Sequence, residues 1–305
     1  MRARLIDGKA MAREIRTGLA REVGELAARG IHPHLVVLAV GEDPAGQIYL
    51  KNQARQCAEV GIRHTLKTLP TTKTEEELVA HVMSLNYDPD VTGILVTLPL
   101  PAGIDAKRIQ GNVWREKDVE GMNPANLGAL LYGEQLTTPC TPLAVMEILR
   151  RTGTALRGKE VTIVGHSNIV GKPLAVLLVN EMATVTVCHE ATADLARHTR
   201  SAEILVVAVG KPGLVTGDMV RPGATVIDVG ITQIPDTGPD GKPVLDAEGR
   251  PRLRTAGDVD LATVGEVADL VTPVPGGVGP LTVAMLLANT VARARRLAAA
   301  PRGPR

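Results

Sequence analysis

The sequence predicts an α/β fold in two domains, and three observations support this prediction. Short apolar runs rich in β-branched residues alternate with longer segments of helical periodicity, as in sheets covered by helices. The runs in the second half are dense and strongly apolar, which is typical of parallel strands buried on both faces. The chain has 305 residues, about twice the usual length of one domain.

The first half of the chain has fewer strand candidates than the second. We expect a first α/β domain over residues 1–138, with a boundary near TTPCTP (137–142). Its strands are expected at HLVVLAVG (34–41) and GILVTLPLP (93–101), and its helices include 45–60 and 74–86.

The second half is denser in apolar runs, and we expect a second domain over residues 139–279 built on a parallel sheet. Segment 231–256 is rich in Pro, Gly and Asp. We interpret it as a hairpin-like excursion rather than a linker between domains. The strands are expected at EVTIVG (160–165), TVTVCH (184–189), ILVVAVG (204–210), TVIDVG (225–230) and ADLVTPV (268–274).

Composition excludes several classes of function. The net charge of +1 provides no basic surface for nucleic acid, and aromatic residues make up only 1% of the chain, with no Phe for base stacking. Three scattered cysteines fit a reducing cytoplasm better than a disulfide framework. The charged start lacks a signal-peptide pattern, and no apolar run approaches the roughly 20 residues of a membrane span. We therefore expect a cytoplasmic protein that binds neither nucleic acid nor membrane.

A glycine loop follows one strand and opens a helix in VTIVGHSNIVGKP (161–173), with the pattern Gly165-x-Ser167-x-x-x-Gly171. Glycines let the backbone approach a pyrophosphate, and a helix N-terminus offers free N–H groups. Because the middle residue is Ser and the spacing is one longer than the standard fingerprint, a ligand-free strand-to-helix turn is the alternative. The next strand ends near Glu190, about 25 residues later, where a Rossmann fold keeps the residue that contacts the adenosine ribose. This context favours a Rossmann-like dinucleotide-binding domain.

A second cluster, TPVPGGVGPLT (272–282), lies between a strand and a helix. It is either a rigid turn or a loop that carries backbone N–H groups toward a ligand. The glycine loop already present favours the second interpretation.

The stretch QIYLKNQARQC (47–57) is expected to be helical. Tyr49 and Gln53 are four residues apart and share one face of such a helix, whereas Lys51 points elsewhere. We interpret Lys51 as a solvated surface residue.

Together these motifs resemble the methylenetetrahydrofolate dehydrogenase/methenyltetrahydrofolate cyclohydrolase family, in order, over about residues 5 to 292. The resemblance implies folate bound at a cleft between two α/β domains and a nicotinamide cofactor on the second domain. It also implies a C-terminal helix (280–300) that packs back on the first domain, and a homodimer. The matching motifs are VGEDPAGQIYL (40–50), AEVGI (58–62), GILVTLPLP (93–101), KDVEGMNPANLG (117–128), PCTP (139–142), GHSNIVGKP (165–173), TVTVCH (184–189), GDVD (257–260) and TPVPGGVGPLT (272–282).

The resemblance implies two reactions and the residues that serve them. In the first, the folate nitrogen pushes a hydride from the methylene carbon to the nicotinamide, which mainly requires alignment. In the second, water adds to the methenyl cation, which requires proton transfer. The implied catalytic positions are Tyr49, Gln53, Thr97 and Glu120. The implied substrate-binding positions are Tyr49, Leu98, Pro99, Glu120, Pro275, Gly276 and Gly277. The implied cofactor-binding positions are Gly165, His166, Ser167, Ile169, Val170, Glu190, Ile231, Gly279 and Thr282.

This sequence departs from the family at three catalytic positions. Gln53 replaces a lysine, Thr97 replaces a glutamine, and Glu120 replaces an aspartate. An amide has no pKa in range and cannot act as general acid or base. Our hypothesis is that hydride transfer persists while the cyclohydrolase step is weak or absent. One alternative is a fully bifunctional enzyme whose protons move through Glu120, Lys51 or ordered water, and another is a folate- or nucleotide-binding homologue with little catalysis.

The cofactor positions also differ: many members bind NADP, some of them through an Arg and a Ser at the positions where this chain has His166 and Glu190. A carboxylate at this strand tip favours the ribose hydroxyl of NAD and repels the 2′-phosphate of NADP. The cofactor is therefore expected to be NADP or NAD, with a lean toward NAD. No metal site is expected, because Cys188 and His189 are adjacent on a strand and have no partners at ligand spacing.

Overall fold

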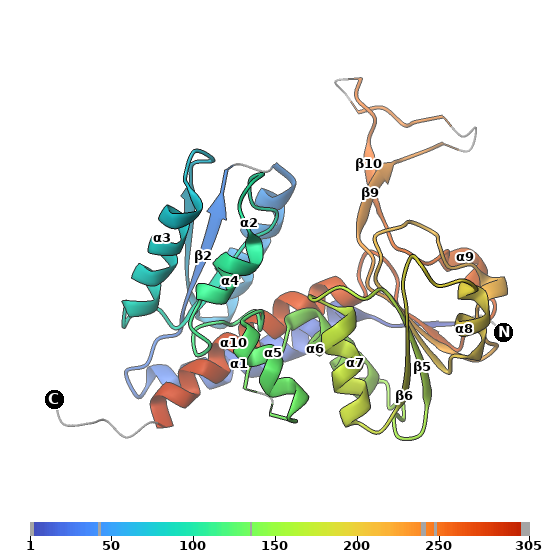
Figure 1. Ribbon diagram of the computed structural model, residues 1–305, viewed down its shortest axis with the longest axis horizontal. Coiled ribbons are helices and arrows are strands. Elements are labelled where there is room, and N and C mark those ends of the chain that lie inside the picture. Colours follow the sequence, from blue (N-terminus) through green and yellow to red (C-terminus); the bar gives the residue numbers. More distant parts are fainter. Residues whose placement is uncertain (1–2, 42–43, 135, 239–241, 247–248, 300–305) are drawn as a thin grey trace. The chain divides into compact units, whose positions relative to one another are not determined.

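The computed structural model describes residues 3–41, 44–134, 136–238, 242–246 and 249–299. The chain divides into two compact units (Figure 1). We call residues 1–10 with 141–281 the sheet unit, and residues 11–140 with 282–305 the helix unit. None of the described helices is long and apolar enough to cross a membrane.

In the described part of the sheet unit, six parallel strands form one sheet in the order β1-β11-β8-β7-β5-β6. The chain passes from β5 to β6 at one edge and then crosses to β7 on the other side of β5. This is the doubly wound order, so the predicted Rossmann-like parallel sheet is confirmed. The strands are β1 (Arg4–Leu5), β5 (Glu160–Val164), β6 (Thr184–Cys188), β7 (Ile204–Val207), β8 (Thr225–Asp228) and β11 (Leu270–Val271).

The core of this sheet is aliphatic, as the absence of Phe requires. All four residues of β7 and of β8 are buried, because helices and loops cover the sheet. Leu205, Val207 and Val226 are fully buried in one cluster with Val264 and Val271. The other elements of the unit are α6 (Cys140–Arg151), α7 (Gly171–Asn180), α8 (Leu195–Ser201), η1 (Gly217–Met219) and α9 (Leu261–Val264).

The start of the chain adds an edge strand that the sequence did not reveal. Arg4 pairs with Leu270 and Leu5 with Val271, and two residues are too few for a period-two pattern. Helix α1 (Gly8–Ala27) begins directly afterwards, and a Cβ on Gly8 would lie 1.8 Å from the carbonyl oxygen of Gly277. Glycine therefore allows the start of α1 to touch the second glycine cluster.

The expected excursion is a two-stranded antiparallel ribbon, and its interpretation as a hairpin is confirmed. Strand β9 (Thr232–Pro235) pairs with β10 (Leu253–Ala256), and Thr232 lies opposite Ala256. In Figure 1 the ribbon projects from its unit, away from the sheet strands.

The helix unit contains a parallel sheet in the order β3-β2-β4 within the described residues. Strands β2 (His34–Val40) and β4 (Gly93–Val96) lie in the predicted segments, and β2 is central. Strand β3 (Arg63–Leu69) was missed because it is a largely exposed edge strand with polar residues. The helices are α1 from residue 11 onward, α2 (Pro44–Val60), α3 (Glu75–Tyr87), α4 (Ala106–Asn112), α5 (Pro124–Leu131) and the C-terminal part of α10 (Val278–Ala299).

Several predicted strands are shorter than expected: those expected over 204–210 and 225–230 end at Val207 and Asp228, and two others end close to a proline. The strand expected over 93–101 ends at Val96, and the strand expected over 268–274 comprises only Leu270 and Val271. In both cases the residues that follow contain Pro, which cannot donate to a strand ladder. The peptide bonds before Pro99 and Pro275 are cis.

Helix α10 contributes to the helix unit through a side-chain amide. Asn289 Nδ2 donates to the carbonyl oxygen of Val119 at 2.9 Å and to that of Thr138 at 3.1 Å. Arg295 pairs with Glu22 of α1 at 3.1 Å on the surface. The loop that ends at Glu120 is therefore held from the C-terminal helix.

Two buried carboxylates organise the loops after β7 and β8. Asp258 Oδ2 accepts from the backbone N–H groups of Val209 at 2.6 Å and Gly210 at 3.0 Å. Asp228 accepts from Gly230 N and Asp258 N through Oδ1, and from Val259 N through Oδ2. Burial raises the pKa of Asp228 to about 6, against the lowering effect of these backbone donors.

We expect Asp258→Ala to lower the free energy of unfolding by about 2–4 kcal/mol, because two buried N–H groups lose their acceptor. Asp258→Asn should cost less, since the amide oxygen can still accept both hydrogen bonds. Urea unfolding of the two variants measures this difference. A loss below about 1 kcal/mol for Asp258→Ala would contradict the assignment.

Candidate active site

Helix α2 presents two of the predicted positions on one face. Tyr49 is 45% exposed, and Gln53, one turn later, is fully buried. Although Tyr49 is partly exposed, desolvation raises the pKa of its phenol above the usual range, and the Gln53 amide acts in the opposite direction. The phenol is therefore neutral at physiological pH. Lys51 is exposed, as expected from its place on the helix.

Gln53 has an unexpected neighbour on β3. His64 Nε2 lies 3.2 Å from Gln53 Oε1, while Gln53 Nε2 is buried and has no hydrogen-bond partner among the described residues. Burial lowers the pKa of His64, and the nearby His34 lowers it further. No sequence pattern indicated this contact, because β3 itself was not predicted.

Thr97 follows β4 directly and faces the backbone of β2. Its N–H donates to the carbonyl oxygen of Leu38 at 2.9 Å, and its hydroxyl lies 3.4 Å from the same oxygen. Leu98, the next residue, is 41% exposed, and Pro99 is also exposed. The structure thus brings Thr97, Leu98 and Pro99 to the carboxyl end of β4.

Glu120 reaches the same end of the sheet because its segment runs beside β4. Ile94 bridges Asp118 in parallel register, and Ile94 N donates to Lys117 O at 2.8 Å. Asp118 is buried and accepts from Gly121 N at 2.9 Å and Asn123 N at 2.7 Å. These bonds hold the loop from which the Glu120 side chain extends.

Glu120 is the strongest candidate for proton transfer in this unit. Burial raises its pKa to about 8, the charge of Asp118 raises it further, and Gln110 lowers it. Gln110 lies on α4 and is 7% exposed, and its Nε2 makes no hydrogen bond within 3.5 Å among the described residues. Gln110 was not predicted from the sequence, where its only signal is a polar residue beside the apolar Ile109 on a short helix.

The glycine loop in the sheet unit has the geometry of a phosphate-binding turn. A Cβ on Gly165 would lie 2.2 Å from the carbonyl oxygen of Ala208, and one on Gly171 would lie 2.0 Å from that of Gly165. Ser167 Oγ accepts from Val170 N at 3.1 Å. No side chain caps the start of α7, which leaves its N-terminal end available to an anion.

Glu190 follows β6, next to the glycine loop after β5. Its carboxylate lies 4.0 Å from His166 Nδ1, and the rings of His166 and His189 meet edge to face at 5.2 Å. Backbone hydrogen bonding lowers the pKa of Glu190, and the His166 charge lowers it further. The strand tip therefore carries a negative charge at neutral pH.

The other predicted cofactor and substrate positions lie as follows. Ile169 and Ile231 are 40% and 62% exposed, and a Cβ on Gly279 would lie 3.4 Å from Ile231 Cδ1. Gly276 has a positive φ of 112°, and Gly277 N donates to Pro273 O at 2.8 Å. Pro275 precedes these two glycines, Val170 ends the first loop, and Thr282 lies in α10.

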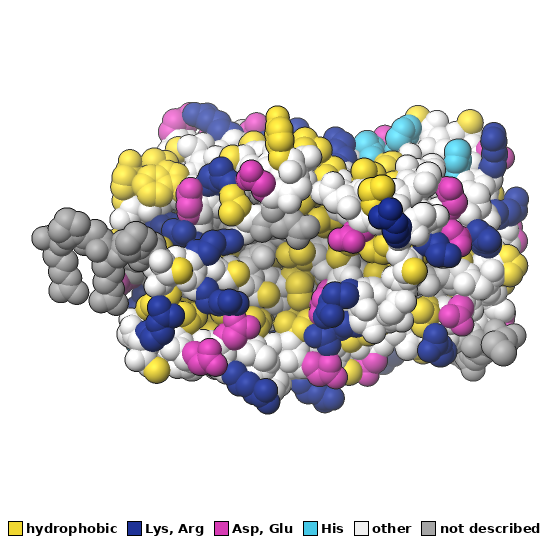
Figure 2. Space-filling model, turned by 90° about the horizontal axis from the view of Figure 1, so that it is seen from below, with side chains coloured by type: hydrophobic (Ala, Val, Ile, Leu, Met, Phe, Trp, Pro, Cys, Tyr) yellow, Lys and Arg dark blue, Asp and Glu magenta, His cyan; other side chains and the backbone are white. Residues whose placement is uncertain are grey.

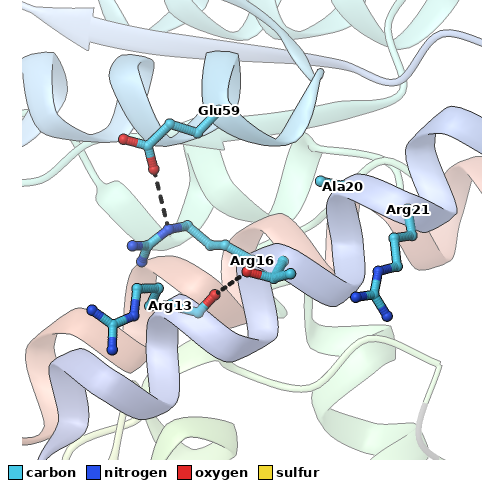
Figure 3. Close-up of a pocket in the computed structure, with 6 residues that line it drawn as sticks. Arg13, Arg16, Ala20, Arg21 and Glu59 are labelled. Carbon is cyan, nitrogen blue, oxygen red and sulfur yellow. Dashed lines mark hydrogen bonds and ion pairs between the residues drawn. The ribbon is translucent and has the colours of Figure 1, made fainter.

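A pocket of about 440 Å³ lies elsewhere in the helix unit, between α1 and α2 (Figure 3). Arg16 reaches toward Glu59, with 3.4 Å between Nε and Oε2. Thr17 and Arg13 are joined by a hydrogen bond of 3.1 Å. Arg21 and Ala20 complete the lining, and none of the predicted site residues takes part.

Charge on the surface is mixed rather than gathered by sign. Figure 2 shows Lys and Arg interspersed with Asp and Glu over one face, in agreement with the net charge of +1. Within the described ranges, no group of three or more His, Cys, Asp or Glu residues is arranged to hold a metal ion.

Two sequence models match most of the chain. Residues 6–120 match "Tetrahydrofolate dehydrogenase/cyclohydrolase, catalytic domain", and residues 139–298 match "Tetrahydrofolate dehydrogenase/cyclohydrolase, NAD(P)-binding domain". The "Bifunctional protein FolD" of Bordetella petrii is 49% identical over 97% of this chain and 95% of its own.

Solved structures agree with the sequence models. A bifunctional FolD methylenetetrahydrofolate dehydrogenase/cyclohydrolase from Campylobacter jejuni has a TM-score of 0.88 and 42% identity, over 97% of this chain and 99% of its own. A Trypanosoma brucei methylenetetrahydrofolate dehydrogenase-cyclohydrolase, solved with NADP and an inhibitor, has a TM-score of 0.91 and 39% identity, over 98% and 100%.

Glu120 makes the stability of the protein depend on pH. Its pKa is raised from 4.5 to about 8 on folding, so the folded state binds more protons between these values, and stability falls as pH rises through them. Glu120→Gln should therefore stabilise the protein by about 2 kcal/mol more at pH 9 than at pH 5. Urea unfolding at both pH values measures this, with Glu25→Gln on the exposed face of α1 as control. An equal effect of Glu120→Gln at both pH values would contradict it.

Proposed function

This chain belongs to the tetrahydrofolate dehydrogenase/cyclohydrolase family, and on that premise we propose that it oxidises methylenetetrahydrofolate to methenyltetrahydrofolate with NAD⁺ or NADP⁺. The observation that carries the proposal is the Gly165–Gly171 loop, where only glycine fits at both ends and the uncapped start of α7 can receive a pyrophosphate. Bound there, the nicotinamide cofactor supplies the hydride acceptor.

Hydride transfer makes few chemical demands on side chains. The lone pair of the folate nitrogen expels the hydride, so the protein needs chiefly to orient the two carbons and exclude water. Tyr49 can border the folate ring as a neutral phenol, with Leu98 and Pro99 as further apolar contacts. None of these roles requires the amine that Gln53 replaces.

Water addition makes the opposite demand, because it requires a group that takes and gives protons. Gln53 cannot serve, and Thr97 has no useful pKa. Our proposal is therefore that the cyclohydrolase step is slow at neutral pH. The methenyl product is then released before the enzyme adds water to it.

One observation favours the fully bifunctional alternative. Glu120 has a pKa of about 8, so it is mostly protonated at pH 7 and ionises over the next two pH units. A cyclohydrolase step that uses Glu120 as base would accelerate as pH rises through 8. The other alternative, a binding homologue with little catalysis, is disfavoured because a pure binding module has no need of both a folate and a cofactor site.

The choice of cofactor rests on the strand tip after β6. The ionised Glu190 favours a free ribose hydroxyl and repels a 2′-phosphate, and His166 offsets that repulsion only when protonated. We propose NAD as the preferred cofactor.

We further propose that the protein acts as a homodimer in the cytoplasm. The family resemblance supports the dimer, and the scattered free cysteines, all three buried, support a reducing compartment. Size-exclusion chromatography with light scattering would test the assembly state.

With methylenetetrahydrofolate and NAD⁺, we expect the methenyl product to accumulate at pH 7, because oxidation is faster than enzymatic water addition. Stopped-flow absorbance of the methenyl product and of NADH follows the two steps together. Enzyme-free hydrolysis at the same pH is the baseline. Rapid enzyme-dependent formation of formyltetrahydrofolate at pH 7 would refute the weak cyclohydrolase step.

The value of kcat/KM should be higher with NAD⁺ than with NADP⁺, because Glu190 repels the additional phosphate. Glu190→Gln removes the charge at nearly constant shape and should reduce the preference by about five- to tenfold. Glu181→Gln, at the far end of α7, is the matched control. A strong NADP⁺ preference in the unaltered protein would overturn the assignment.

A further inference from the structure

The pocket between α1 and α2 is lined chiefly by arginine. Among the described residues that line it, three guanidinium groups accompany one carboxylate, and none of the side chains is aromatic. Its volume of about 440 Å³ lies in the range of small-molecule sites, about 300–1,000 Å³. Because such sites are usually apolar, this lining suits a ligand that is recognised by its charge. The lining residues are Arg13, Arg16, Thr17, Ala20, Arg21 and Glu59.

The three arginines share one face of α1 because of their spacing. The lining positions of this helix recur at intervals of three and four residues, which places them side by side on its surface. Arg13 and Arg21 are eight residues apart, so their Cα atoms are separated by about 12 Å along the helix axis. Figure 3 shows these two residues on either side of Arg16 along the helix. Like charges on one helix face repel each other, and an anion bound among them would offset that repulsion.

Arg16, between the other two arginines, is held in place by α2. Its Nη1 donates to Gln56 Oε1 at 3.2 Å, and its Nε lies 3.4 Å from Glu59 Oε2. Gln56 is buried, and the Arg16 side chain is only 20% exposed. A guanidinium group has more N–H donors than these two contacts use, so Arg16 can still donate to a ligand.

The single carboxylate of the pocket is already paired. Glu59 Oε1 lies 3.7 Å from Arg55 Nε, while Oε2 faces Arg16. Among the described residues, no carboxylate forms an ion pair with Arg13 or Arg21. Both guanidinium groups can therefore bind an anion, and arginine holds phosphate and carboxylate oxygens through two parallel N–H groups.

We propose that this pocket binds a small polyanion, that is, a molecule with several phosphate or carboxylate groups in a row. Arg13 and Arg21 bind its two ends, and Arg16 binds its middle. None of the predicted folate or cofactor positions lines the pocket, so the site is a further one and does not rest on the proposed function.

Calorimetric titration of the full chain tests the proposal with two probes, inorganic triphosphate and citrate. Low ionic strength is used, because salt screens exposed charges. We expect the unaltered protein to bind one probe or both, and Arg13→Gln/Arg21→Gln to weaken that binding about tenfold or more. Binding of triphosphate alone identifies phosphate as the ligand group, and binding of citrate alone identifies carboxylate.

Lys67→Gln/Lys107→Gln is the matched control, because it removes two positive charges from exposed positions of the helix unit outside the pocket. Its Kd should stay within about twofold of the value for the unaltered protein. Glu59→Gln removes the carboxylate of the pocket and should tighten binding about threefold. Glu76→Gln, at the exposed start of α3, removes a carboxylate elsewhere and should leave the Kd nearly unchanged.

Three results would overturn the proposal. The first is that the unaltered protein binds neither probe. The second is that Arg13→Gln/Arg21→Gln binds as tightly as the unaltered protein, which would place the anion elsewhere, for example at the glycine loop of the sheet unit. The third is an equal loss in both double variants, which would reflect net charge alone. The melting temperature of ligand-free Arg13→Gln/Arg21→Gln should be unchanged or higher, because Gln favours the helix and like charges are removed.

Discussion

Buried carboxylates that accept backbone N–H groups hold the functional loops of this protein. Asp258 binds the N–H groups that follow β7, and Asp228 binds those of the neighbouring loop, including the N–H of Asp258 itself. Asp118 has the same role in the helix unit, where it accepts from Gly121 and Asn123. Parallel strands end with free N–H groups, and burying these without an acceptor is costly. The geometry of both sites depends on these acceptors.

The two reactions of the family place different demands on such a scaffold, and this chain meets them unequally. Hydride transfer depends on orientation, which rigid loops and close-packed glycines provide. Water addition depends on a group that titrates near neutral pH. Gln53 cannot titrate. Burial raises the pKa of Glu120, so this carboxyl group is the one that titrates near neutral pH. The chain thus lacks the amine at Gln53 and has at Glu120 a carboxyl group whose pKa lies close to neutral.

Several elements could be predicted because their residues carry the signal locally. Strands β2 and β7 are apolar along nearly their whole length, α3 begins with a capping box at Thr74 and Glu77, and the hairpin is rich in Pro and Gly. Strand β1 was not predicted, because two residues are too few to show the alternating pattern of a strand. Strand β3 escaped because an exposed edge strand needs no apolar face. With β3 unpredicted, its His64 could not be placed beside Gln53.

The sequence by itself determined the fold class, the family and the positions at which the chain departs from it, because motif spacing and hydrophobic pattern are local properties. Tertiary structure alone decided that Glu120 titrates near pH 8, that Gln110 lies near it, and that His64 contacts the Gln53 amide. A pKa depends on desolvation and on charges brought close by folding, and the contact of Gln53 with His64 depends on a residue of another strand. Both therefore arise only when distant segments pack together.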